Sequence, residues 1–446
     1  MDNVAAPSQD ETNATFRKVM WRIIPVLMIS YILAFVDRGN VGFAKLQFMS
    51  DLHFSEAVFG LGGGLFYLGY SVLEIPSNLW LARVGARLTL LRIMVLWGIC
   101  SAALAFMTQP SHYYILRSLL GAAEAGFFPG VLFYITTWVP ASRRGQFTAV
   151  FMSAIAVSGI VSGPLSGSIL HAGDGLLGLR GWQWLFIAEG VPAAIMGVVV
   201  YVLLADRPES ATWLSPRQVA IITTELRAEE DSKRGHSHGN FLAALSDRRL
   251  YVLVGMSIGL IAGGAGIPLW LPTIIRNVGV KDSFTIGLLA AIPYIVAMVV
   301  QQIVARHSDR TQERRWHAAI PTFACALGWV LLAQVTDSPW IAIVLLTVMT
   351  AGYLGATGPY WTIPAMYLSG PAAAGGIALI TTCGGIGAFF APTIVGWLTT
   401  QTGSLAYGLY FYGAIMALGA ILMLAGTSPV TTAAPTAGSL GRPARS

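Results

Sequence analysis

Long apolar segments recur along the chain, separated by short polar ones. A helix of roughly 20 apolar residues crosses a bilayer. Segments of about this length occupy residues 22–38, 57–80, 88–107, 112–134, 147–170, 183–205, 249–272, 284–305, 318–336, 339–362, 371–398 and 404–426. Because lipid cannot hydrogen-bond to the backbone, each segment must be helical. The pattern predicts an all-α membrane protein with twelve transmembrane helices.

One long charged stretch divides these segments into two sets of six, and its pattern predicts a short amphipathic helix near residues 216–230. The fifth and eleventh segments each place a glycine five residues before a proline. Two six-helix halves with weak internal symmetry are typical of alternating-access transporters. We expect four regions: a first half 1–205, a cytoplasmic central loop 206–247, a second half 248–430 and a cytoplasmic tail 431–446.

Composition supports a membrane protein. Charged residues make up 11% of the chain and the mean hydropathy is +0.66, whereas a soluble domain carries about 25% charged residues. Residues 338–441 contain no Asp, Glu, Lys, Arg or His. Cys100, Cys325 and Cys383 all lie in apolar segments without metal-ligand spacing. We therefore expect neither a metal nor any other cofactor.

The Lys and Arg residues that give the chain its net charge of +6 are unevenly distributed between alternate loops. If the N-terminus is inside, the inner loops and tails hold 21 of the 27 Lys and Arg residues. The outer loops then hold only Lys45, Arg180, Arg276 and Lys281. Cytoplasmic loops are enriched in Lys and Arg, so both termini are predicted to be cytoplasmic. The basic balance therefore does not indicate a nucleic-acid partner.

Ionisable residues within the predicted spans are confined to the first half. They are Asp37, Arg38, Glu74, Arg117, Glu124 and Glu189. Such residues cost about 2.5–3.5 kcal/mol each on insertion scales and mark transport pathways. This asymmetry indicates that the first half handles protons and charge, while the second supplies shape, aromatic rings and hydroxyls.

The spacing of the charged residues predicts how they are arranged. Arg117 and Glu124 lie nearly two turns apart, about 10 Å, on one helix face. Asp37 and Arg38 lie about 100° apart and should face different neighbours. We expect Arg117 to balance Asp37 or Glu124, leaving Arg38 free for a substrate. The alternative is a fixed ion-pair network that locks the first and fourth spans together.

Other polar and aromatic residues are weaker candidates. Glu74 is expected to act in gating near the inner end of its span, and Glu189 to cap polar groups near the outer end. Asn40 is expected to end a helix. The candidate substrate contacts are Tyr31, Tyr67, Trp361, Thr362 and Thr381. For each aromatic residue among them, the alternative interpretation is that it packs in the helix bundle without contacting a substrate.

Four segments resemble the anion:cation symporter family of the major facilitator superfamily. They are VDRGNVGFA, GYSVLEIPSNLWLARVGAR, RSLLGAAEAGFFPGVLFYITTWVP and LSGPAAAGGIALITTCGGIGAFFAPTIVGWL. The chain is most similar to the bacterial tartrate/phthalate/hydroxyphenylacetate permease branch, whose members carry organic anions, usually with protons. The resemblance implies that Asp37 and Glu124 titrate protons, and that Arg38 and Arg117 deal with the substrate anion and with coupling.

The chain departs from the superfamily's inner-loop pattern at one position. The segment NLWLARVGAR has Ala82 where the pattern has Asp, which puts the usual latch of the first half in doubt. The second copy, ARHSDRTQERR, keeps its acidic residue. Together with Glu74, the residues assigned to gating are Arg83, Gly85, Arg87, Asp309 and Arg310.

These observations predict proton-coupled uptake of a small organic carboxylate by a monomer in the bacterial inner membrane. The alternative is facilitated diffusion or exchange of organic anions without protons. Two intramembrane arginines disfavour a drug/proton antiporter, which would need a net negative cavity for cations. The spans contain no nucleophile, metal cluster or cofactor motif of an enzyme, and the central loop is too short for a signalling domain. Few Asn and Gln in the spans favour a less hydroxylated or aromatic acid.

Overall fold

The computed structural model describes residues 7–233, 248–367 and 370–426. Within these residues the chain is helical and contains no strand. Eleven of the helical segments in this described part are long and apolar enough to cross a membrane. The predicted all-α membrane fold is therefore confirmed.

The first half contains six spans, two of which are broken. Gly126 interrupts the fourth span with a positive φ of 87°, and Ser153 interrupts the fifth. The helices are α1 (Gln9–Asp51), α2 (Glu56–Val84), α3 (Ala86–Ala103), α4 (Pro110–Glu124), α5 (Phe127–Thr136), α6 (Ala141–Met152), α7 (Ala154–Ala172) and α8 (Gly181–Leu203). Broken helices expose backbone groups where they line a pathway.

The second half contains the six remaining spans, α11 (Arg248–Asn277), α12 (Ser283–Thr311), α13 (Arg315–Leu332), α14 (Pro339–Tyr367), α15 (Gly370–Thr402) and α16 (Ala406–Gly426). Only α13, at the span predicted for 318–336, is not among the eleven apolar segments found in the described residues. Its first turn holds Arg315, Trp316 and His317, which lower its hydropathy. It nevertheless packs against α14 and α16 like its neighbours.

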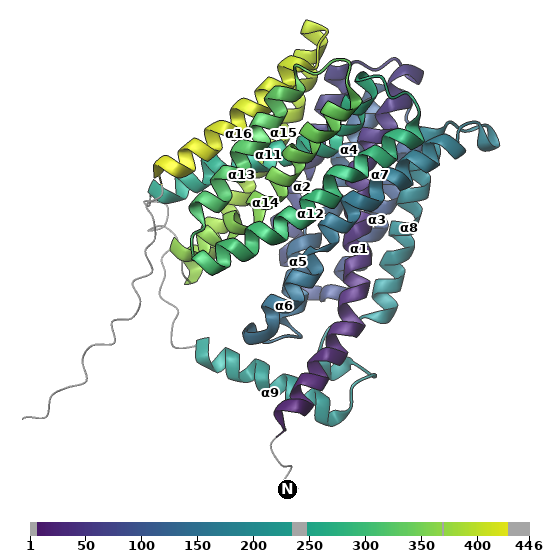
Figure 1. The fold of residues 1–446 in the computed structure, drawn as a ribbon. Coiled ribbons are helices and arrows are strands. Elements are labelled where there is room, and N and C mark those ends of the chain that lie inside the picture. Colours follow the sequence, from purple (N-terminus) through teal and green to yellow (C-terminus); the bar gives the residue numbers. More distant parts are fainter. Residues whose placement is uncertain (1–6, 234–247, 368–369, 427–446) are drawn as a thin grey trace, which may run out of the picture.

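The two halves form two bundles that meet closely at one end. A Cβ added to Gly42 would lie 2.2 Å from the carbonyl oxygen of Pro268, so α1 and α11 touch through their backbones. Likewise, a Cβ on Gly60 would lie 2.2 Å from the carbonyl oxygen of Pro392. We call this the closed end. The ribbons of the two bundles diverge toward the opposite end, which carries the N-terminus and α9 (Pro216–Lys233) (Figure 1).

The predicted amphipathic helix of the central loop is α9 (Pro216–Lys233). It is attached to the first half by polar contacts. Arg217 forms an ion pair with Glu11, and Arg144 forms one of 3.1 Å with Glu229. The end of the predicted loop (234–247) and the predicted tail (431–446) lie outside the described residues, and the limits of the four predicted regions remain predictions.

Candidate functional site

Asp37 is completely buried and is held by neutral donors. Asn40 Nδ2 donates to its Oδ1 over 3.0 Å, and Trp97 Nε1 donates to its Oδ2 over 2.9 Å. The hydroxyl of Ser101 also donates to Oδ1. Trp97 and Ser101 lie one turn apart on α3, so Asp37 faces α3. The prediction that Asn40 ends a helix is wrong, because α1 continues to Asp51 and uses Asn40 inside it.

Arg38, the next residue, faces α2 and α4. Its Nε donates to Glu124 Oε1 over 2.7 Å, and its Nη2 lies 2.6 Å from the same oxygen. The Arg38 side chain is 20% exposed, whereas that of Glu124 is 0% exposed. Arg38 is therefore the member of the pair that a ligand can reach, and breaking the pair would leave Glu124 as an uncompensated buried charge.

Aromatic rings surround the Arg38 guanidinium. Its central carbon lies 5.0 Å from the ring centre of Phe35, 5.6 Å from that of Phe66 and 5.3 Å from that of Tyr70. Cation–π contacts stabilise a guanidinium by about 0.5–2 kcal/mol. The rings provide apolar walls and, through Tyr70, one hydroxyl.

The expectation that Arg117 balances Asp37 or Glu124 and leaves Arg38 free is wrong for Arg38, which pairs with Glu124. Arg117 acts on both carboxyl groups only at a distance. Within the described residues, Arg117 forms no ion pair. Its Nε donates to the carbonyl of Gly62 over 3.4 Å, its guanidinium lies 4.8 Å from the Phe66 ring, and its Nη1 is buried without a hydrogen-bond partner. The cause is the close approach of α2 and α4, where a Cβ on Gly121 would lie 1.9 Å from the carbonyl oxygen of Phe66. Arg117 therefore lies against α2.

The two candidate tyrosines have different surroundings. Tyr31 is buried and stacks on Phe151 and Phe128, with ring centres 4.6 Å and 5.7 Å away. This stacking supports the interpretation of Tyr31 as a packed core residue and not as a substrate contact. Tyr67 is only partly buried, and Tyr294 and Tyr353 of the second half lie within electrostatic range of it. Tyr67 therefore lies where the halves face each other.

Within the described residues, the three candidates from the second half form no hydrogen bond or ion pair with the charged residues Asp37, Arg38, Arg117 and Glu124. Trp361 is exposed and packs edge-on against Tyr360. The hydroxyl of Thr362 donates to the carbonyl of Pro359 over 2.7 Å, and that of Thr381 donates to the carbonyl of Ile377 over 3.1 Å. Both hydroxyls are thus bonded within their own helices, and their roles in binding remain predictions.

The first predicted gating loop, between α2 and α3, is hydrogen-bonded to Asp206, an acidic residue more than a hundred positions later in the chain. The backbone N–H of Arg87 donates to Asp206 Oδ1 over 2.9 Å, and Arg87 Nη2 donates to the carbonyl of Tyr201 over 2.6 Å. Gly85 has a φ of 91°, and a Cβ there would lie 2.7 Å from Asp206 Oδ1. Asp206, beyond the end of α8, thus contacts the loop that lacks an Asp at position 82. Arg83 is exposed.

Glu74 is partly buried near the same end of α2 as this loop. Its carbonyl oxygen accepts a hydrogen bond from Asn78 Nδ2 over 2.9 Å, one turn further along the helix. The described residues give no ion pair to its carboxyl group, so a role in gating stays a prediction.

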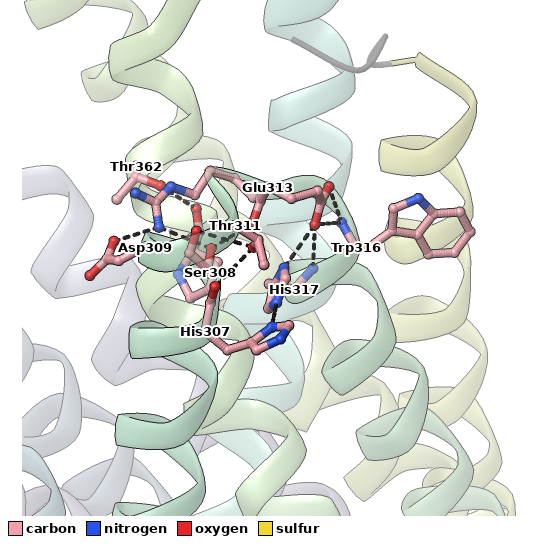
Figure 2. A network of polar contacts seen from close by, with 10 residues as sticks. His307, Ser308, Asp309, Thr311, Glu313, Trp316, His317 and Thr362 are labelled. Carbon is pink, nitrogen blue, oxygen red and sulfur yellow. Dashed lines mark hydrogen bonds and ion pairs between the residues drawn. The ribbon is translucent and has the colours of Figure 1, made fainter. Parts of the chain in front are cut away.

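The second gating loop, between α12 and α13, forms a compact polar network (Figure 2). Arg314 forms an ion pair of 2.6 Å with Asp309 and donates to the hydroxyl of Ser308 over 2.9 Å. Ser308 in turn donates to the carbonyl of Glu313 over 2.7 Å. Arg310 is exposed.

Glu313 caps the start of α13 in this network. Its carboxylate accepts from the backbone N–H of Trp316 over 2.8 Å and lies 2.8 Å from His317 Nδ1 (Figure 2). Partial burial raises the pKa of Glu313, but the hydrogen bonds from Trp316 and His317 outweigh it, so the pKa is lowered overall.

The family model of the Major Facilitator Superfamily matches residues 27–375 of this chain. The chain belongs to the Major Facilitator Superfamily. It is therefore a transporter and not an enzyme, as the sequence predicted.

Two curated relatives cover nearly the whole transporter. A protein of Agrobacterium vitis named "Putative tartrate transporter" is 43% identical over 93% of this chain and 92% of its own length. A protein of Acinetobacter baumannii named "Quinolone resistance transporter" is 39% identical over 91% of this chain and 93% of its own length. Both names describe those relatives.

Solved structures share the fold of this transporter. A crystal structure of a D-xylose-proton symporter matches with a TM-score of 0.74, covering 92% of this chain and 98% of that chain. The identity is only 16%, so the match concerns the fold alone.

Sequence reasoning missed several partners of the charged residues. Asn40 lies one turn from Asp37, a spacing that indicates a shared face. Trp97 and Ser101 are four residues apart on α3, which also places them on one face, and both donate hydrogen bonds to Asp37. Nothing in the sequence indicated which of the two arginines would reach Glu124.

Proposed function

We propose that this transporter moves a small organic carboxylate into the cell together with protons. The observation that carries the proposal is the ion pair between Arg38 and Glu124, of which only Arg38 is partly exposed. A guanidinium binds a carboxylate by charge-assisted and often bidentate hydrogen bonds. A substrate carboxylate and Glu124 would therefore compete for one cation.

This competition couples the anion to a proton. Protonation of Glu124 removes its charge and releases Arg38, which can then bind the substrate carboxylate. Loss of the proton on the inner side restores the Glu124 carboxylate, which pairs with Arg38 again and displaces the anion. The pair as it stands corresponds to the empty, deprotonated transporter.

Asp37 and Arg117 have supporting roles in this proposal. Arg117 lies within electrostatic range of both Asp37 and Glu124 without pairing with either. Its positive charge offsets these two carboxylates, and a substrate would reach it only in a conformation that exposes its buried side chain. Asp37 is the second protonatable group, separated from the ligand by the backbone of α1.

The substrate class follows from the groups around Arg38. One accessible guanidinium among the rings of Phe35, Phe66 and Tyr70 suits one carboxylate on a body with few hydroxyls. The relative named as a tartrate transporter supports a carboxylate substrate. The rings around Arg38, and not this relative, are the reason to favour a less hydroxylated or aromatic acid over a sugar acid.

Alternating access would use the two ends of the molecule. The excess of Lys and Arg on the side of the N-terminus and α9 supports a cytoplasmic location for that side. The closed end would then face outward, and this conformation would be open to the cytoplasm. We propose that the halves 1–205 and 248–430 rock as two units, in a monomer of the bacterial inner membrane.

The test is uptake by purified protein in liposomes. Labelled phthalate, tartrate, hydroxyphenylacetate and galactonate are each supplied with and without an inward proton gradient. The proposal requires that at least one acid accumulates only with the gradient. Accumulation that is indifferent to the gradient and to a protonophore would instead support facilitated diffusion or exchange.

A second candidate is export of an aromatic acid, favoured by the relative named as a quinolone resistance transporter. The same liposomes distinguish it. A fluoroquinolone loaded inside would leave faster when protons are supplied from outside, and none of the four acids would accumulate.

A further inference from the structure

A second buried carboxyl group lies close to Asp37 and has no role in the proposed cycle. It belongs to Glu189 on α8, which is 3% exposed. Its Oε1 accepts a hydrogen bond of 2.8 Å from the hydroxyl of Ser166 on α7. The expectation that Glu189 caps polar groups near the outer end is incomplete, because its carboxyl group is also within electrostatic range of Asp37.

No cation compensates Glu189. Within the described residues, no Lys, Arg or His forms an ion pair with it, and the charged group that acts on it is the carboxyl of Asp37. Cys100 on α3 is also within range of Asp37. An ionised Glu189 would therefore be a buried charge without an ion-pair partner and within range of a like charge, which is a strongly unfavourable arrangement.

Buried polar atoms without a hydrogen-bond partner indicate that the Glu189 carboxyl group carries a proton. The Asn40 amide is the group that the two acids share: its Nδ2 donates to Asp37 over 3.0 Å, and the amide is also within hydrogen-bonding range of the Glu189 carboxyl group. Glu189 Oε2 and Asn40 Oδ1 are both buried without a partner. Both atoms are acceptors when Glu189 is ionised. A proton on Glu189 Oε2 would make that atom a donor, and Asn40 Oδ1 is an unpartnered acceptor on the amide that Glu189 already approaches.

Close packing keeps Glu189 away from water. A Cβ on Gly98 would lie 2.5 Å from the carbonyl oxygen of Gly190, and one on Gly190 would lie 2.7 Å from the backbone nitrogen of Ala102. The backbones of α3 and α8 therefore touch beside Glu189. In this structure the Glu189 side chain is thus shielded from solvent.

We propose that Glu189 is a permanently protonated carboxylic acid that donates to Asn40 Oδ1 and so holds the Asn40 amide against Asp37. Glu189 is a positioning residue: it orients the donor of Asp37 and does not itself carry the transported proton. The proposal rests on the proposed function for the role of Asp37, but the protonation of Glu189 can be measured without any transport.

The first test is infrared spectroscopy of the detergent-purified protein, titrated with acid and base. We expect a carboxylic-acid C=O band that does not titrate over the pH range in which the protein is folded and that disappears in Glu189→Gln. Ser166→Ala, which removes the donor to Oε1, should shift this band without abolishing it. Glu209→Gln, which alters an exposed carboxylate, should change no such band. Absence of the band in the wild type would overturn the proposal.

The second test is transport as a function of pH. Glutamine can replace both the donor and the acceptor of a neutral acid, so Glu189→Gln should keep at least half of the wild-type rate with an unchanged pH profile. Glu189→Leu should lose at least tenfold in rate, and its thermal unfolding shows whether it is folded. A shifted pH profile in Glu189→Gln would make Glu189 a titrating group and contradict the proposal. If uptake needs no protons but the infrared band is present, only the proposed function fails.

Discussion

Arg38 on α1 and Glu124 on α4 are separated by 86 residues in the chain and form one ion pair, in which Arg38 Nε donates to Glu124 Oε1 over 2.7 Å. The glutamate is the last residue of α4, directly before the break at Gly126. Arg38 is in the middle of α1, among aromatic rings. The pair therefore joins the two helices at the level of the broken span, where a ligand can reach only the arginine.

Replacing Arg38 by lysine tests the geometry of anion binding. Lysine keeps the charge but loses the planar fork that binds a carboxylate with two hydrogen bonds. We expect Arg38→Lys to raise the KM for the carboxylate about tenfold, equivalent to about 1.4 kcal/mol. Initial rates of uptake in liposomes measure the change. Arg22→Lys, at an exposed position of the same helix, is the control, and equal effects of both variants would contradict the assignment of Arg38.

A side chain at Gly42 tests the closed end. A Cβ there would meet the carbonyl oxygen of Pro268 at 2.2 Å, so Gly42→Val cannot close this end without separating α1 and α11. We expect uptake to fall at least tenfold while the protein remains folded, and thiol labelling of cysteines placed near Gly60 to increase. Gly145→Ala is the matched control, because nothing lies within 4 Å of its added Cβ. Wild-type uptake by Gly42→Val would contradict the described packing.

The cap at Glu313 predicts a pH-dependent contribution to stability. The pKa of this carboxyl is lower in the folded protein than its ordinary value. Such a group stabilises the fold above its unfolded pKa, and this contribution is lost as the pH falls through the folded pKa. Loss of a cap costs about 1 kcal/mol, so Glu313→Ala should lower the Tm by about 1–3 °C at neutral pH.

The thermal unfolding of Glu313→Ala in detergent should converge with that of the wild type at acid pH, as the pH falls through the lowered pKa of the wild-type carboxyl group. Glu209→Ala, at an exposed position, serves as the control and should leave the Tm unchanged at both pH values. A Tm difference that is the same at neutral and acid pH would show that Glu313 acts through packing rather than through its charge.

The helical architecture could be predicted from the sequence because hydropathy reports directly on the bilayer. Even α13, with charged and polar residues in its first turn, lies at its predicted position, since the apolar remainder of the segment decides its fold. The amphipathic helix α9 was predicted from the residue pattern of the charged stretch between the two halves. The breaks at Gly126 and Ser153 were not predicted, because glycine and serine are also tolerated in continuous membrane helices.

The pairing of charges could not be predicted. Helical spacing placed Arg117 and Glu124 on one face, but their partners depend on how α1, α2 and α4 pack. The contact of Gly121 with the backbone of Phe66 turns Arg117 toward α2 and leaves Glu124 to Arg38. Similarly, Asp206 contacts Gly85 across more than a hundred residues, and no local pattern indicates that contact.

The most direct measurement of the central claim is proton uptake on substrate binding. Purified transporter in weakly buffered detergent solution is mixed with the carboxylate that accumulates in liposomes, and a pH indicator follows the bulk proton concentration. Because binding requires a protonated Glu124, we expect the wild type to take up about one proton per anion at neutral pH. Glu124→Gln should bind the anion without any proton uptake. Anion binding by the wild type with no proton uptake at any pH would contradict the proposed competition for Arg38.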